Sequence, residues 1–79
     1  MLSKDFARRF GEVVRKHRKA AGMTQEQLAE KADLAPKMIS LVERFERNPS
    51  LNVADSIAQG LGIPLWQITR DAENLKRKK

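Results

Sequence analysis

Side chains able to carry out acid–base or nucleophilic chemistry are few and scattered in this 79-residue chain. His17 is the only histidine, and it falls near the apolar side of a predicted helix, where a hydrogen-bonded, partly buried histidine is far more common than a general base. The chain has no cysteine, and no group of histidine, aspartate and glutamate has the spacing of metal ligands. Gly60 and Gly62 do not lie in a phosphate-binding motif. The sequence therefore predicts no enzyme, no metal site and no cofactor.

Basic side chains offer a different chemistry, the binding of an anionic partner. The chain has 16 lysines and arginines against 10 acidic residues, a net charge of +6. Residues 1–22 carry seven basic and two acidic groups, residues 70–79 carry five and two, and residues 23–69 sum to −2. Positive charge at both ends suits a nucleic acid or an acidic membrane surface. On charge alone, a solubilising surface with a basic tail is an equally good interpretation.

Composition also excludes several classes of protein. A length of 79 residues with 41% hydrophobic residues fits one small domain. Disulfide-stapled scaffolds are excluded because cysteine is absent, and the apolar runs are too short for a transmembrane helix. Residues 1–5 lack the apolar stretch of a signal peptide. We therefore expect a cytoplasmic protein that does not enter a membrane.

Apolar residues recur at spacings of three and four, which predicts helices and no long strand. Ser3 can cap a first helix that ends at Gly22, a residue suited to a left-handed cap. One side of this helix is expected to be apolar, with His17 near it. The other side is expected to carry the basic residues Arg8, Arg9, Arg15, Lys16 and Lys19. Thr24 and Gln27 match a capping box that opens a second, short helix.

Three further helices are predicted in the second half of the chain. Pro36 can occupy the first turn of a helix that runs to about Arg44. Ser50 can cap a fourth helix that ends near Gly62, and a fifth helix follows Pro64. Five short helices with tight connections predict a compact all-α bundle.

The predicted domain plan divides the chain into three parts. Residues 1–13 form the N-terminal part of the first helix, and residues 14–70 form the folded domain, with a helix-turn-helix at about 24–44. Residues 71–79 are expected to form a basic C-terminal tail that frays, because its last residues have no apolar neighbour to pack against.

The two helices between residues 24 and 44 are the most informative part of the sequence. Two short helices joined by a tight turn can place the second helix in the major groove of DNA. The helical period turns Ile39 and Val42 inward and gives a polar outward stripe of Lys37, Ser40 and Arg44. An ordinary solvated helix face remains an alternative interpretation of this stripe.

Between Val14 and Ile68 the chain resembles the lambda-repressor and Cro helix-turn-helix family, the XRE-like regulators. The residues that carry the resemblance are Arg15 and Arg18, Gly22-Met23-Thr24-Gln25 with Leu28-Ala29, Ile39-Ser40 with Glu43-Arg44, Arg47-Asn48-Pro49-Ser50-Leu51, and Ala58 with Leu61-Gly62-Ile63. Within the family, the chain looks most like small stand-alone members such as the controller proteins of restriction–modification systems. The resemblance implies a five-helix bundle of the lambda-repressor-like DNA-binding type.

The resemblance also implies which residues contact double-stranded DNA. They are Thr24, Gln25, Pro36, Lys37, Ser40, Leu41, Arg44, Arg47 and Asn48. Gln25 is expected at a phosphate, and Lys37 is the best candidate for reading a base, because lysine can donate to guanine O6 and N7. Leu41 can contact only a thymine methyl group, and Arg47 with Asn48 is expected to hold the phosphate backbone.

An ion pair between Arg18 and Glu43 is implied by the same resemblance. It would join the first and third helices and fix their orientation more than it stabilises the fold, because burial of both charges offsets much of their attraction. Two separate surface charges are the alternative.

Four positions depart from the family pattern. His17 stands where an aliphatic core residue is common, and Pro36 removes a donor where relatives often offer a polar side chain. Asp33 replaces a frequent glycine in the turn, in a conformation that aspartate adopts less easily. Phe45 replaces the glycine that often follows Glu-Arg. A positive φ at this phenylalanine would be strained, so we expect the helix to run on or the loop to be rearranged.

Trp66 is the one large aromatic residue of the fifth predicted helix. Leu65 and Ile68 fit core positions, which leaves Trp66 at least half exposed in a monomer. An exposed tryptophan with apolar neighbours often marks an interface, so we expect a homodimer formed through Ile63, Leu65 and Trp66. A tryptophan folded over the edge of its own domain is the alternative.

These observations together favour a sequence-specific transcriptional regulator that binds a palindromic operator as a homodimer through the recognition helix 36–44. An antitoxin or adaptor that uses the same fold to bind a protein is an alternative. It should carry a segment able to cover its partner, and only residues 1–5 and 71–79 are available for one. A third interpretation is a non-specific nucleic-acid binder that depends on the basic ends.

Overall fold

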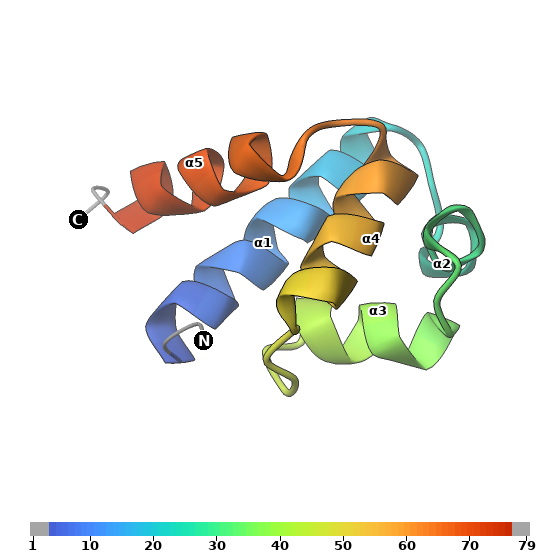
Figure 1. Ribbon diagram of the computed structural model, residues 1–79, viewed down its shortest axis with the longest axis horizontal. Coiled ribbons are helices and arrows are strands. Elements are labelled where there is room, and N and C mark those ends of the chain that lie inside the picture. The colour runs from blue at the N-terminus through green and yellow to red at the C-terminus, as the bar shows by residue number, and fades with distance from the viewer. Residues whose placement is uncertain (1–3, 77–79) are drawn as a thin grey trace.

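The computed structural model describes residues 4–76, which form five helices joined by short turns (Figure 1). The helices are α1 (Lys4–Ala20), α2 (Gln25–Ala32), α3 (Pro36–Glu43), α4 (Leu51–Leu61) and α5 (Leu65–Lys76). The predicted all-α five-helix fold is confirmed, and the described part of the chain contains no strand.

One hydrophobic core takes side chains from all five helices. The largest fully buried ones are Phe10 and Val14 of α1, Leu28 of α2, Ile39 and Val42 of α3, Ile57 of α4 and Ile68 of α5. Burial of one such side chain contributes roughly 1.5–3 kcal/mol relative to leaving it in water. Helix α2 packs on α4, α5 packs on α1, and α3 contacts both α1 and α2 (Figure 1). The inner face of α3 is therefore anchored on two other helices.

Side-chain caps begin two of the helices as the sequence predicts. The Thr24 hydroxyl accepts a hydrogen bond from the Gln27 backbone N–H at 3.0 Å, and the Gln27 side chain accepts one from the Thr24 N–H at 2.9 Å, which completes the capping box of α2. The Ser50 hydroxyl accepts from the Val53 N–H at 3.1 Å at the start of α4. The cap expected at Ser3 lies outside the described residues.

The first four helices end in the same type of turn, in which a residue with positive φ lets two backbone N–H groups return to the last turn of the helix. Gly22 and Gly62 take this position after α1 and α4, with φ of 72° and 77°, and the predicted left-handed cap at Gly22 is confirmed. After α2 the position belongs to Asp33, with φ of 58°. A Cβ atom in this conformation costs roughly 1–2 kcal/mol, so Asp33 stores strain.

The end of α3 at Phe45 differs from the expectation. Helix α3 does not run on, and the turn is not rearranged, because Phe45 itself adopts the left-handed conformation with φ of 64°. The Phe45 N–H donates to the Val42 carbonyl at 3.2 Å, and the Glu46 N–H donates to the Leu41 carbonyl at 2.9 Å. These bonds satisfy two carbonyl groups at the end of α3 and hold a phenylalanine where glycine would be unstrained.

Gly11 sets the distance between α1 and α3. A Cβ atom at this position would collide with the Val42 carbonyl oxygen and would lie 3.3 Å from the Phe45 ring. The last turn of α3 therefore approaches the backbone of α1 more closely than any larger residue permits.

The C-terminal part of the chain also differs from expectation. Residues 71–76 were expected to belong to a frayed tail but continue α5, because Ala72 and Leu75 extend the apolar stripe of Ile68 at helical spacing. Ala72 is completely buried against α1. Residues 77–79, the rest of the expected tail, lie outside the described residues.

The longer α5 explains why the prediction for Arg9 was wrong. Arg9 was assigned to the polar side of the first helix, yet α5 covers it and only 6% of the residue is exposed. Its Nη1 donates to the Ala72 carbonyl at 2.7 Å, and its guanidinium stacks 4.9 Å from the centre of the Phe6 ring. Hydrogen bonds from Arg8 and Arg9 lower the pKa of the Asp5 carboxyl. Arg9 therefore ties α1 to α5 and belongs to the structure of the domain rather than to its basic surface.

Replacing Asp33 with glycine should stabilise the protein, because glycine adopts the left-handed turn without strain. We expect a gain of about 0.5–1 kcal/mol, since the greater freedom of glycine in the unfolded chain offsets part of the relief. The matched control, Asp33→Ala, keeps a Cβ atom and should bring no gain. Urea unfolding of the three proteins measures the difference. An Asp33→Gly variant less stable than the parent would contradict strain at this turn.

Candidate nucleic-acid interface

Helices α2 and α3 form a helix-turn-helix unit with a turn at residues 33–35. Pro36 is the first residue of α3, where its missing N–H and fixed φ suit the start of a helix. Ile39 and Val42 are buried on the inner face, as predicted. We call Pro36, Lys37, Ser40, Leu41 and Arg44 the outer face of α3. Pro36, Lys37 and Arg44 are exposed, whereas Ser40 and Leu41 are half-buried.

The remaining residues expected to contact DNA lie on both sides of this helix. Thr24 is exposed at the start of α2, where its hydroxyl and N–H are both engaged in the capping box. Gln25 is half-buried in the first turn of α2. Arg47 and Asn48 are exposed in the loop between α3 and α4. The residues expected to contact DNA therefore come from the start of α2, the outer face of α3 and the loop after α3.

A buried ion pair joins α1 to the end of α3. The Arg18 Nε donates to Glu43 Oε2 at 2.7 Å and its Nη2 donates to Oε1 at 3.0 Å, while only 8% of Arg18 and 5% of Glu43 is exposed. The hydrogen bonds to Glu43 raise the pKa of the Arg18 guanidinium above its ordinary value. The ion pair implied by the family resemblance is therefore present, with two parallel hydrogen bonds.

Two more hydrogen bonds extend the pair into a network that we call the Arg18–Glu43 network. Arg18 Nη1 donates to the Met23 carbonyl at 2.8 Å, in the turn after α1. Gln25 Nε2 donates to Glu43 Oε1 at 3.0 Å from the first turn of α2. Glu43 of α3 is thereby bonded to α1 and to α2, and its partner Arg18 is also bonded to the turn between these two helices. The family resemblance implied only a phosphate contact for Gln25. The bond to Glu43 was missed because the spacing of residues 25 and 43 carries no periodic signal.

A second ion pair lies at the exposed end of α3. Arg44 Nη2 donates to Glu46 Oε1 at 2.9 Å, and its Nε donates to Oε2 at 3.3 Å. These bonds raise the pKa of the Arg44 guanidinium above its ordinary value. Glu46 was not among the residues that the sequence singled out, although it is directly bonded to one of them.

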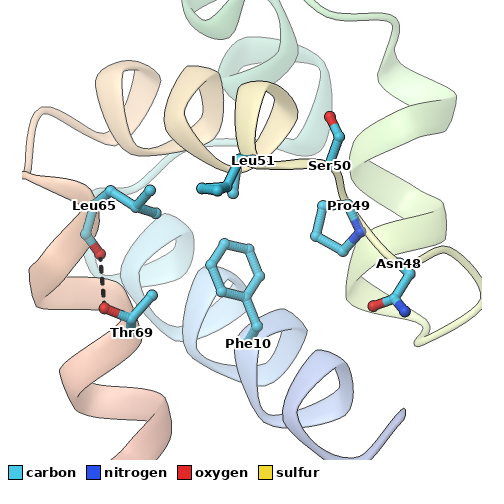
Figure 2. A pocket seen from close by; sticks show the side chains of 8 residues that line it. Phe10, Asn48, Pro49, Ser50, Leu51, Leu65 and Thr69 are labelled. Carbon is cyan, nitrogen blue, oxygen red and sulfur yellow. Dashed lines mark hydrogen bonds between the residues drawn. The ribbon is translucent and has the colours of Figure 1, made fainter. Parts of the chain in front are cut away.

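The residues expected to form a dimer interface lie at the start of α5 and in the turn before it. Trp66 is 61% exposed, and the Arg70 guanidinium lies 5.3 Å from the centre of its ring. Ile63 and Leu65 are half-buried. Leu65 lines an open pocket of about 570 Å³ together with Phe10 and Leu51, and Figure 2 shows these side chains around the pocket. Trp66 does not line this pocket, but Leu51 is 74% exposed and Leu65 is half-buried, so apolar surface is accessible near the start of α5.

The remaining candidates for chemistry belong to the structure of the domain. His17 is partly buried, and its Nε2 lies 3.0 Å from Asp71 Oδ2 on α5, which agrees with the predicted hydrogen-bonded histidine. Within residues 4–76, no group of three side chains is arranged to hold a metal ion. No helix in that range is both long enough and apolar enough to cross a membrane.

Comparison with known proteins identifies the class of this arrangement. Residues 14–65 match a protein family described as helix-turn-helix, and this range is more than half of the chain. The chain belongs to the helix-turn-helix family. The predicted resemblance to XRE-like and Cro-like regulators is confirmed.

Individual relatives agree with this assignment. The chain is 37% identical over 70 residues to control protein C.MunI of Mycoplasma sp, which covers 87% of this chain and 95% of that protein. It is 35% identical over 68 residues to the immunity repressor protein of Bacillus phage phi105, covering 86% of this chain and only 47% of the phage protein. The crystal structure of the wild-type restriction–modification controller protein C.Esp1396I matches with a TM-score of 0.87 at 30% identity, covering 94% of this chain and 95% of that one.

Family membership settles the broad function. The chain is a DNA-binding transcriptional regulator of the helix-turn-helix class and is not an enzyme, as its residues predicted.

Breaking the buried ion pair on one side should be strongly destabilising. Glu43→Met leaves the Arg18 guanidinium buried without its partner, and we expect a loss of about 3–5 kcal/mol in the free energy of unfolding. Arg18→Met combined with Glu43→Met removes both charges and should recover most of that loss. Urea unfolding of the parent, both single variants and the double variant measures the coupling. Additive losses in the double variant would contradict a buried, mutually dependent pair.

Proposed function

We propose that the protein is a sequence-specific regulator that binds a palindromic operator as a homodimer, with the outer face of α3 in the major groove. The observation that carries the proposal is the geometry of α3: its inner side is buried, its end is locked by the Arg18–Glu43 network, and Lys37 and Arg44 point to solvent from the opposite side. A helix held in this way can present the same side chains to every operator that it meets.

The proposed roles divide between bases and phosphates. Lys37 stands in the first turn of α3, is exposed, and has no ion-pair partner in the described part of the chain, so its ammonium can reach guanine O6 and N7. Ser40 and Leu41 lie one turn further along the same face. Arg47 and Asn48 follow in the loop, where contacts to the phosphate backbone fix position rather than sequence.

The proposed dimer supports this role, because one helix-turn-helix reads only a few base pairs. Two-fold dimers place two recognition helices about 34 Å apart, one turn of DNA, on a symmetric site. The exposed Trp66 ring with Ile63 and Leu65 beside it has the aromatic and apolar character of an interface centre.

In-vitro selection tests the proposal as a whole. The purified protein is incubated with randomised duplex DNA at near-physiological salt, and the bound fraction is amplified and sequenced. Enrichment of a two-fold-symmetric motif is the expected result. Binding without enrichment that collapses as the salt concentration rises would overturn sequence-specific binding, and a protein partner would then become the better hypothesis.

Lys37→Ala and Arg47→Ala should have different effects on binding. Loss of a base contact costs about 1–3 kcal/mol and relaxes the preference at one position, so Lys37→Ala should change the selected motif. Arg47→Ala should weaken binding to all duplexes alike and lower the dependence of affinity on salt. Fluorescence anisotropy with the selected duplex and single-base variants distinguishes the two. Identical behaviour of both variants would contradict the division of roles.

Trp66→Ala should dissociate the dimer. We expect the sedimentation mass to fall to that of one chain and the affinity for the symmetric site to fall with it, because the two half-sites are no longer bound together. The control is Phe45→Ala, which removes another exposed aromatic ring outside the proposed interface and should leave the mass unchanged. An unchanged mass and affinity for Trp66→Ala would exclude this interface.

A further inference from the structure

The ion pair between Arg44 and Glu46 lies where α3 ends and the loop begins. The Arg44 guanidinium donates from Nη2 to Glu46 Oε1 at 2.9 Å and from Nε to Oε2 at 3.3 Å. Both side chains are more than half exposed, with 61% and 52% of their areas accessible. Arg44 belongs to the outer face of α3, so its partner bears directly on how that face meets DNA.

The strained turn at Phe45 creates this pair. Residues two apart on a helix do not face each other, because they point in directions about 200° apart. The left-handed conformation of Phe45 reverses the chain, and the Glu46 N–H then bonds back to the Leu41 carbonyl at 2.9 Å. Arg44 is held in turn by its own N–H, which donates to the Ser40 carbonyl at 3.0 Å. The backbone of both partners is thus fixed, and the ordering of the two side chains is the entropy cost that remains for the pair.

The carboxylate occupies one edge of the guanidinium and leaves another edge open. A guanidinium has five N–H donors: one on Nε, two on Nη1 and two on Nη2. Glu46 accepts from the edge formed by Nε and Nη2. The end formed by Nη1 and the second N–H of Nη2 remains accessible, and this end has the spacing to donate to O6 and N7 of one guanine.

The same carboxylate makes Arg44 a poor ligand for phosphate. A phosphate oxygen brought to this guanidinium would approach the negative charge of Glu46, and the pair as a whole is neutral. An uncharged acceptor such as a guanine edge meets no such repulsion. The pair therefore favours base contact over backbone contact for Arg44.

We propose that Glu46 is a positioning residue that directs the open end of Arg44 to a guanine in the major groove and keeps this arginine away from the phosphate backbone. The inference rests on the proposed function, since it requires that the outer face of α3 reads bases. Glu46 is thereby a determinant of specificity although it contacts no DNA itself.

Glu46→Gln tests the proposal with a side chain of nearly the same shape and no charge. The probes are the duplex that the parent enriches by selection and a scrambled duplex of the same length, titrated by fluorescence anisotropy over a range of salt concentrations. Affinity for the scrambled duplex should rise several-fold and its salt dependence should steepen by about one ion, as Arg44 becomes available to phosphate. The ratio of the two affinities should fall about tenfold, with the loss confined to one G·C pair in each half-site.

Two further variants separate positioning from charge. Glu30→Gln removes the same charge from an exposed residue of α2 and should change both affinities together, with their ratio intact. In an Arg44→Ala background, Glu46→Gln should no longer alter the ratio, because the residue through which it acts is gone. An unchanged ratio for Glu46→Gln alone, or an equal fall in the Arg44→Ala background, would overturn the role of Glu46. Failure of the parent to enrich any motif would instead overturn the proposed function.

Discussion

The buried contact between Arg18 and Glu43 is the interaction on which the position of α3 depends. Removing two charges from water costs several kcal/mol for each ion unless hydrogen bonds replace the lost solvation. Here Glu43 accepts from Arg18 and Gln25, and Arg18 also donates to the Met23 carbonyl. No buried side-chain polar atom lacks a partner in residues 4–76. Because few arrangements of α1, α2 and α3 satisfy both charges at once, the network specifies an orientation more than it adds stability.

Close backbone packing acts on the same helix from its inner side. Gly11 has no Cβ atom, so the carbonyl of Val42 can approach the backbone of α1 closely. The left-handed conformation of Phe45 then turns the chain back over the end of α3. Strain of this kind persists only where surrounding contacts hold it, and here buried Val42 and the two returning N–H groups do so. The turn matters for the outer face of α3, because it places the Glu46 carboxylate against the Arg44 guanidinium. One strained residue thereby links the packing of the core to the charge that the outer face of α3 presents.

The sequence predicted those features that depend on local patterns. Thr24 with Gln27, Ser50 and Gly22 mark helix ends through the hydrogen bonds of their own neighbourhood, and family resemblance supplied the pair of Arg18 and Glu43. Contacts made between distant parts of the chain could not be found in this way. Arg9 is buried because α5 covers it, and its hydrogen-bond partner there is a backbone carbonyl 63 residues away, which no side-chain pattern could reveal. The ion pair between Arg44 and Glu46 depends on the positive φ of Phe45. A glycine at this position would have predicted such an angle, whereas a phenylalanine does not.

The most direct test of this account uses the double variant with Arg18→Met and Glu43→Met, at a temperature where its unfolding curve shows it fully folded. The measurement is the ratio of its affinities for the selected duplex and a scrambled duplex. If the network sets the orientation of α3, the ratio should fall at least about tenfold while the domain stays folded, because base contacts depend on placement and phosphate contacts much less so. A folded double variant whose ratio stays within about twofold of the parent's would show that apolar packing alone orients the helix, and would contradict the account.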